Sequence, residues 1–268
     1  GCSAKGDIFS FVQHFEGIDF LGALKILADR AGVVLTYDKS SQSKDERERF
    51  YQIMEEATKY FETVFEKSAS VGGEQNARAY LTGRGLSDST IKLFRIGYAP
   101  AQWRSVSDYL IKKGFRENDL EKVGLIKKGT SGFYDRFRSR IMFPISDSSG
   151  RVIAFSGRIF YLPNSPKPEI EEAKYLNSPD TPLFNKSNTL FGIDKAKTAI
   201  RARGYSIVVE GQMDLILSHQ ADFINTVAVS GTALADTETS SELKVNNLGL
   251  IKRLSPNVIF AYDGDEAG

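Results

Sequence analysis

Residues 206–214 are Ser-Ile-Val-Val-Glu-Gly-Gln-Met-Asp, and residues 258–268 are Val-Ile-Phe-Ala-Tyr-Asp-Gly-Asp-Glu-Ala-Gly. In each stretch a short apolar run, typical of a buried strand, ends at a carboxylate beside a glycine. Helical periodicity over 193–202, 213–219 and 243–250, with another strand at 226–229, fills the neighbouring chain. This alternation predicts a parallel sheet with right-handed crossovers.

Three carboxylates follow these two strands. Glu210 comes directly after Val209, and Asp263 and Asp265 come after the strand at 258–262. Ligands of open parallel sheets bind at the carboxyl edge, so we expect these groups in one crevice. Three anions so placed repel one another unless a hard cation such as Mg²⁺ (or Mn²⁺) lies between them. The pattern therefore favours phosphoryl or nucleotidyl transfer.

A simpler interpretation applies to each carboxylate alone. An acidic residue after a strand often caps the next helix, as Glu210 or Asp263 could do. The two strand ends taken together favour the metal interpretation. Asp214 shares a helix face with Glu210, and either a supporting role or a solvated position suits it.

The chain before residue 193 contains several kinds of predicted element. We expect helices over 8–15 and 20–31, opened by Asp7 and Asp19, and a polar linker over 37–48. A helix should follow to about residue 67, with a turn at 68–74 and short helices over 77–125. Strands at 141–145 and 151–155 flank the hairpin signal Asp147-Ser148-Ser149-Gly150. Five of the eight prolines fall in 163–182, which predicts a long loop.

Basic residues are concentrated around this hairpin. Residues 134–158 hold five arginines and two aspartates, and Arg136, Arg138 and Arg140 should project on one side of an extended segment. Residues 174–187 add further cationic and amide groups within the proline-rich loop. Cations beside aromatic rings suit phosphate contact and base stacking on a single strand, although an arginine run alone is most often a solvated face.

The acidic motifs Val209-Glu210-Gly211-Gln212-Met213-Asp214 and Asp263-Gly264-Asp265 resemble the TOPRIM domain of primases, topoisomerases and related nucleases. The upstream segments resemble the DnaG-type bacterial primases over nearly the whole chain. They are YDRFRSRIMFPI (134–145), Gly157-Arg158, KYLNSPDTPLFNKS (174–187), the segments at 79–81, 84–87 and 97–100, and Trp103.

This resemblance implies roles for individual residues. Glu210, Asp263 and Asp265 would hold Mg²⁺, which neutralises the triphosphate and helps to activate the attacking 3′-hydroxyl. Nucleotide phosphates, template or primer would be held by a second set: Arg138, Arg140, Arg158, Lys174, Asn177 and Lys186. The chain departs from the family at Ser156, where Gly is usual, and at Gln212, where Tyr is common; neither departure changes a charge.

Gly1-Cys2-Ser3-Ala4-Lys5-Gly6-Asp7 resembles the end of the primase zinc ribbon, with Cys2 as its last ligand. Structural zinc needs four ligands, so we expect Zn²⁺ in the intact protein but not in this stretch. His14, on a predicted helix, is expected in the core or on the surface.

Composition limits the alternatives. The 268 residues are 41% hydrophobic with a net charge of +1, no apolar run long enough to span a bilayer, and one cysteine. These features favour a soluble cytoplasmic protein without disulfides. The chain starts without Met and stops inside a strand-to-helix turn, so we expect an internal fragment, inactive by itself.

The resemblance implies an α/β protein, in which an α+β N-terminal subdomain precedes an incomplete Rossmann-like parallel-sheet TOPRIM subdomain. We expect residues 1–36 to be the zinc-ribbon tail with following helices, 37–198 the basic N-terminal subdomain, and 199–268 the truncated TOPRIM subdomain.

The expected function is Mg²⁺-dependent synthesis of short RNA primers from NTPs on single-stranded DNA by a monomer. The replicative helicase is the implied partner, through a C-terminal domain outside this chain. A TOPRIM nuclease or topoisomerase remains an alternative, as does a non-catalytic single-strand-binding module. The basic segment at 174–186 argues against a nuclease or topoisomerase. The acidic crevice argues against a binding module, because carboxylates repel phosphate.

Overall fold

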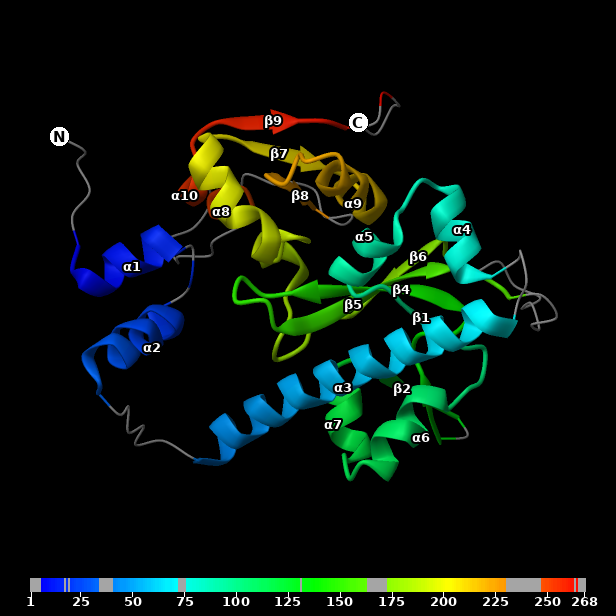
Figure 1. Ribbon diagram of the computed structural model, residues 1–268. Coiled ribbons are helices and arrows are strands. Elements are labelled where there is room, and N and C mark those ends of the chain that lie inside the picture. The colour runs from blue at the N-terminus through cyan, green and yellow to red at the C-terminus, as the bar shows by residue number, and fades with distance from the viewer. Residues whose placement is uncertain are drawn as a thin grey trace.

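The computed structural model describes residues 6–16, 18, 20–33, 41–71, 76–130, 132–162, 173–229, 247–262 and 264. The strands of this part form a four-stranded antiparallel sheet, a two-stranded hairpin and a three-stranded parallel sheet. The long helix α3 runs along one side of the antiparallel sheet, and the parallel sheet lies on the other side of the molecule (Figure 1).

The helices have the following bounds: α1 (Ile8–Glu16), α2 (Phe20–Ala31), α3 (Ser41–Val71), α4 (Ala77–Gly83), α5 (Asp88–Leu93), α6 (Ser105–Lys112), α7 (Glu117–Lys122), the 3₁₀ helix η1 (Lys186–Asn188), α8 (Ile193–Arg203), α9 (Gln212–Gln220) and α10 (Asn247–Leu254). The strands are β1 (Gly97–Ala99), β2 (Ile126–Gly129), β3 (Gly132–Asp135), β4 (Arg140–Ser146), β5 (Val152–Ile159), β6 (Tyr175–Asn177), β7 (Ser206–Val209), β8 (Thr226–Ala228) and β9 (Val258–Phe260).

The antiparallel sheet has the order β1-β4-β5-β6 and is built on the predicted hairpin. The Asp147 carboxylate accepts hydrogen bonds from the backbone N–H groups of Ser149 and Arg151, which closes the turn between β4 and β5. Helix α3 packs on this sheet through Phe61, whose ring lies edge-on to Phe155 at 5.4 Å. A Cβ at Gly97 would lie 2.5 Å from the Phe61 Cβ, so this close approach requires glycine.

Helix α3 corrects two predictions. It begins at Ser41, so the expected linker over 37–48 is wrong from residue 41 onward. It ends at Val71, so the turn expected at 68–74 is wrong for residues 68–71, and residues 72–74 lie outside the described part. A charged side chain of the supposed linker and another just after it bind the neighbouring helix α7: Glu46 lies 2.6 Å from Lys122, and Arg49 lies 2.9 Å from Asp119. Local polarity suggested a solvated linker, whereas these tertiary ion pairs support a helix.

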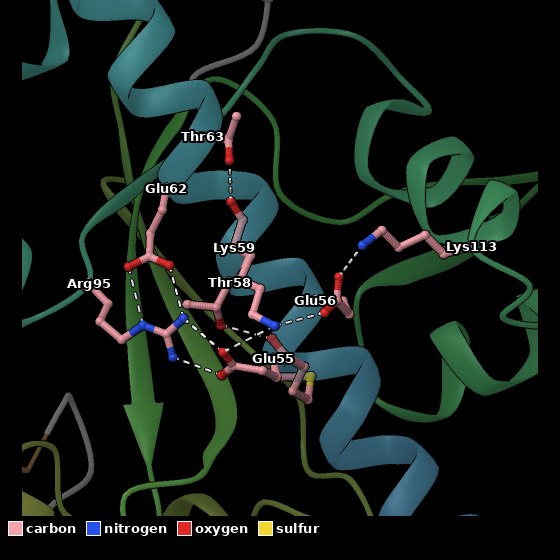
Figure 2. Close-up of polar contacts among 9 residues, drawn as sticks. Glu55, Glu56, Thr58, Lys59, Glu62, Thr63, Arg95 and Lys113 are labelled. Carbon is pink, nitrogen blue, oxygen red and sulfur yellow. Dashed lines mark hydrogen bonds and ion pairs between the residues drawn. The ribbon is translucent and has the colours of Figure 1, made fainter.

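Arg95 joins α3 to the turn between α5 and β1. Its guanidinium lies 2.8 Å from Glu55 and 2.9 Å from Glu62, which are two turns apart on α3 (Figure 2). Arg95 has a φ of 53°, a left-handed conformation that is uncommon for a residue with a side chain. The two carboxylates hold the residue there and fix the path of the chain into β1.

The parallel sheet has the predicted form, with β7 central in the order β8-β7-β9. Its two faces are covered by different helices. Val208 and Val227 pack with Ala196 and Ile200 of α8 and with α10. Val209 and Ala228 share a second core with α9, and this core continues into the antiparallel sheet.

Helix α9 therefore lies between the two sheets. Leu215 packs so closely on Gly192 that a Cβ there would lie 2.7 Å from the Leu215 side chain. His219 meets the ring of Phe94 edge-on at 5.5 Å. The predicted domain boundary at 198/199 falls inside α8, whose residues pack on the parallel sheet.

Two further expectations differ from the structure or lie partly outside it. The proline-rich region contains strand β6, which pairs with β5, where a loop was predicted; residues 163–172 lie outside the described part. The last predicted helix spans Asn247–Leu254, and the predicted residues 243–246 are not among those described. None of the helices in the described part of the chain is long and apolar enough to cross a membrane.

We predict that protonation of His219 weakens the fold. Burial lowers the pKa of His219, and the nearby charge of Lys195 lowers it further, against opposing effects of the Thr226 carbonyl and Asp194. The unfolded chain binds this proton near pH 6.5 and the folded chain only at lower pH. The contribution of neutral His219 to the free energy of unfolding is thus fully present above about pH 6.5. It is lost as the pH falls through the folded pKa.

Urea unfolding at about pH 7.5 and 5.5 measures this effect, since that interval brackets the ordinary histidine pKa. We expect a lower free energy of unfolding at the acidic pH and a smaller difference in the His219→Gln variant. Equal pH dependence in both proteins would show that His219 is not responsible.

Candidate functional site

Glu210 lies at the carboxyl edge of the parallel sheet. It follows β7, whose Val208 pairs with Phe260 of the neighbouring parallel strand β9. The Ala261 N–H continues this pairing by donating to the Val208 carbonyl at 2.9 Å. Burial raises the pKa of Tyr262, and the negative charge of Glu210 raises it further, which places Tyr262 near that carboxylate.

Asp263 and Asp265 lie outside the described residues. The structure confirms that the strands preceding Glu210 and Asp263 are neighbours, while the convergence of the three carboxylates stays a prediction. Within the described part, no group of three or more His, Cys, Asp or Glu residues could hold a metal. The partly exposed carboxylate of Glu210 supplies hard oxygen donors of the type that Mg²⁺ binds.

Helix α9 begins two residues after Glu210 without a capping side chain on its N-cap residue, Gly211. Gln212, its first residue, instead donates from Nε2 to the Ser156 hydroxyl of β5 at 3.1 Å. The two positions at which the chain departs from the resembled family therefore contact each other. Asp214 is exposed, and its carboxylate folds back so that a Cβ on Gly211 would lie 2.6 Å from its Oδ2.

Arg158 lies on the side of the antiparallel sheet that faces α9. It follows Ser156 by two residues on β5, so the two side chains share a face. Its guanidinium donates to the Tyr175 hydroxyl at 2.8 Å and lies 5.6 Å from the centre of the Tyr80 ring. The side chain is partly exposed.

Arg140 points to the opposite face of the same sheet. It pairs with Ile159, and a Cβ on Gly157 would lie 3.0 Å from the Arg140 Cδ. Only 3% of Arg140 is exposed, and its guanidinium donates to the carbonyls of Gly157 and Ala173, each at 3.0 Å. The role predicted for Arg140 in nucleic-acid binding stays a prediction; its observed contacts tie together two backbone segments.

The expected extended arginine segment is not continuous. Strand β3 ends at Asp135 and β4 begins at Arg140, and Ser139 between them has a φ of 49°. This left-handed residue breaks the alternation on which the prediction depended. Arg136 turns to the Asn177 carbonyl, to which its Nη2 donates at 3.1 Å.

Arg138 forms a partly exposed cluster with two aromatic rings. Its guanidinium carbon lies 4.4 Å from the centre of the Trp103 ring and 5.2 Å from that of Tyr134. Trp103 is 63% exposed, so one large ring is available to a ligand. Such a combination can stack a base and neutralise a phosphate.

Two further predicted residues lie beside the parallel sheet. Asn177 and Lys186 line a small cavity with Val229, the residue after β8. Lys186 and Lys174 are exposed, and the Lys186 N–H donates to Asp180 at 2.9 Å. Cys2, the predicted zinc ligand, lies outside the described residues, and so does the side chain of His14.

Sequence analysis missed the role of Asp135. This residue is 1% exposed, and its carboxylate accepts hydrogen bonds from the N–H groups of Val106 and Ser107 at 2.8 and 3.1 Å. It thereby caps helix α6, whose own N-cap residue, Arg104, makes no side-chain capping bond. An uncapped helix start at 105 was the available signal, but the sequence does not show which distant residue would cap it.

Comparison with known proteins gives consistent similarities along the chain. The profile for the DNA primase catalytic core, N-terminal domain, matches residues 60–197, and that for the Toprim domain matches residues 204–268. A DNA primase of Deinococcus radiodurans is 38% identical over all of this chain, which spans 43% of that relative. The chain thus spans less than half the length of the curated relatives it matches.

Solved structures of DnaG primase domains are also similar to this chain. The RNA polymerase domain of Mycobacterium tuberculosis primase DnaG has a TM-score of 0.69 and 33% identity, covering 82% of this chain and 68% of that one. A DnaG primase catalytic domain bound to ssDNA has a TM-score of 0.66 and 32% identity, covering 84% and 64% respectively.

We predict that Asp135→Asn lowers the free energy of unfolding by about 1–2 kcal/mol, since a capping acceptor is replaced by an amide N–H₂ that faces a backbone N–H. Urea unfolding measures the change. Asp108→Asn makes the same substitution at an exposed residue of α6, and we expect a change within about 0.5 kcal/mol. A similar loss in the two variants would contradict the capping role.

Proposed function

This chain belongs to the bacterial DNA primase family, and on that premise we propose that its intact protein synthesises short RNA primers from NTPs on single-stranded DNA in the cytoplasm. One observation carries the proposal. The parallel pairing of β7 with β9 brings Glu210 beside the strand that leads to Asp263, and α9 joins this edge to the sheet bearing Arg158.

Glu210, Asp263 and Asp265 would hold Mg²⁺ or Mn²⁺ through carboxylate oxygens. The bound ion supplies Lewis-acid stabilisation of phosphate charge in nucleotidyl transfer. In this proposal Glu210 is the ligand fixed by the described fold, because β7 is the central strand of its sheet.

Arg158, Lys174, Asn177 and Lys186 would bind nucleotide phosphates or the nucleic-acid backbone near this edge. Arg138 would contact the template where Trp103 offers a base-stacking surface. Support comes from the similar catalytic domain described as bound to ssDNA. We assign Arg140 a supporting role, in which it holds the Ala173 carbonyl and so the chain that leads to Lys174.

The organisation of the intact protein follows from the same premise. We propose a zinc-ribbon tail in residues 1–36 with Cys2 as a Zn²⁺ ligand, a basic subdomain in 37–198 and a TOPRIM subdomain in 199–268. The protein would act as a monomer with the replicative helicase as partner. The nuclease or topoisomerase alternative is not favoured, because the primase-specific profile covers residues 60–197.

The first test is RNA primer synthesis by the full-length protein on single-stranded DNA with NTPs and Mg²⁺. We predict that Glu210→Gln lowers kcat by about 100-fold or more, because one metal-binding carboxylate is lost. Its DNA affinity should stay within about twofold, since no phosphate-binding cation changes. A fully active Glu210→Gln would contradict the metal role, and an inactive parent with helicase supplied would contradict the primase function.

A second prediction concerns phosphate contact. Lys174→Gln and Lys186→Gln should each weaken ssDNA binding and reduce the slope of log K against log salt by about 0.7, the value for one phosphate contact to a single strand. Fluorescence anisotropy over a range of salt concentrations measures the slope. Lys112→Gln, an exposed residue on α6, is the matched control and should leave the slope unchanged.

A further inference from the structure

The first and last residues of α9 are glutamines, and both bind the N-terminal part of the chain. At the start of the helix, Gln212 donates to the Ser156 hydroxyl of β5 at 3.1 Å. At its end, the Gln220 amide accepts from the Ser87 N–H at 2.8 Å and donates to the Gly85 carbonyl at 2.7 Å. The helix is therefore attached at its start to β5, which carries Arg158, and at its end to the loop between α4 and α5.

These two attachments differ in burial. Gln212 is 4% exposed and Ser156 is fully buried, whereas Gln220 is exposed to solvent. A buried amide and hydroxyl keep their hydrogen bond because losing it leaves an unsatisfied group without water. The Gln212–Ser156 bond therefore constrains the first turn of α9 more strongly than the bonds of Gln220 constrain the last.

The attachments also differ in their distance from the candidate metal edge. Gln212 is two residues from Glu210, with only Gly211 between them, and the first turn has no capping side chain on its N-cap residue. Gln220 lies about 12 Å further along the helix, given a rise of about 1.5 Å per residue. Apolar packing at Leu215 holds the middle of the helix, so the Gln212 bond orients its start.

We propose that Gln212 is a positioning residue for Glu210: its buried bond to Ser156 fixes the carboxylate relative to the sheet that carries Arg158. This inference rests on the proposed metal role of Glu210. The Ser156–Gln212 pair thereby sets metal affinity and turnover, in addition to its contribution to stability.

The test uses the full-length protein and two readouts. Electron paramagnetic resonance of the free ion measures Mn²⁺ affinity. The relevant site is the one that no longer binds Mn²⁺ in the Glu210→Gln variant. Primer synthesis gives kcat and the half-saturating Mg²⁺ concentration. Glu210→Gln thus tests the proposed function separately: Mn²⁺ binding equal to the parent would overturn both the metal role and this inference.

The decisive variant is the double substitution Ser156→Ala with Gln212→Leu. Replacing both partners of a buried hydrogen bond by apolar groups is close to neutral for stability, so Tm should stay near that of the parent. We expect Mn²⁺ affinity and kcat nevertheless to fall about tenfold, the lower end of the effect of losing support behind a metal ligand. DNA affinity should be unchanged.

Gln220→Leu is the matched control, because it removes an amide from the same helix and the same interface. We expect its Mn²⁺ affinity and kcat to equal those of the parent even if Tm falls. The inference is overturned if the double variant keeps the parent's Mn²⁺ affinity and kcat while Glu210→Gln loses Mn²⁺. Equal losses of affinity and kcat in Gln220→Leu would likewise overturn it.

Discussion

The arrangement of the whole molecule depends on the burial of one face of α9 against two sheets at once. Val209 and Ala228 of the parallel sheet share a continuous core with residues of the antiparallel sheet, and Met213 and Ile216 of α9 belong to it. Because close-packed interiors resist displacement, neither sheet can shift without disturbing this core. The sheet edge that carries Glu210 and the sheet that carries Arg158 therefore keep a fixed relation, although the two residues are far apart in sequence.

The pleat of the antiparallel sheet places two of the arginines on opposite faces. Arg158 faces α9, and Arg140 faces the other side, where it holds the carbonyls of Gly157 and Ala173. Two cations from one basic motif thus meet different surroundings. One can contact a ligand, and the other is enclosed by backbone, so a high local density of arginine does not by itself measure the size of a phosphate-binding surface.

Sequence patterns predicted those features that depend on neighbouring residues. The turn around Asp147, the strand that ends at Glu210 and the parallel order of strands were all visible, since turn chemistry and apolar runs act locally. Features that depend on residues distant in sequence could not be predicted in this way. The start of α3 depends on α7, and Asp135 caps a helix 29 residues earlier in the chain. The contact between Ser156 and Gln212 likewise joins residues 56 positions apart.

The position of β7 in the middle of its sheet has a consequence for the order of assembly. Both neighbours of β7 come later in the chain, and β9 comes last. A ribosome therefore releases the antiparallel sheet, β7 and α9 before β9, the strand that pairs with β7 and leads to Asp263. Ser156 and Gln212 are both synthesised by then, so the hydrogen bond that holds the start of α9 can form before β9 pairs with β7. A nascent chain can thus fold around α9 before β9 and the residues after it have been synthesised.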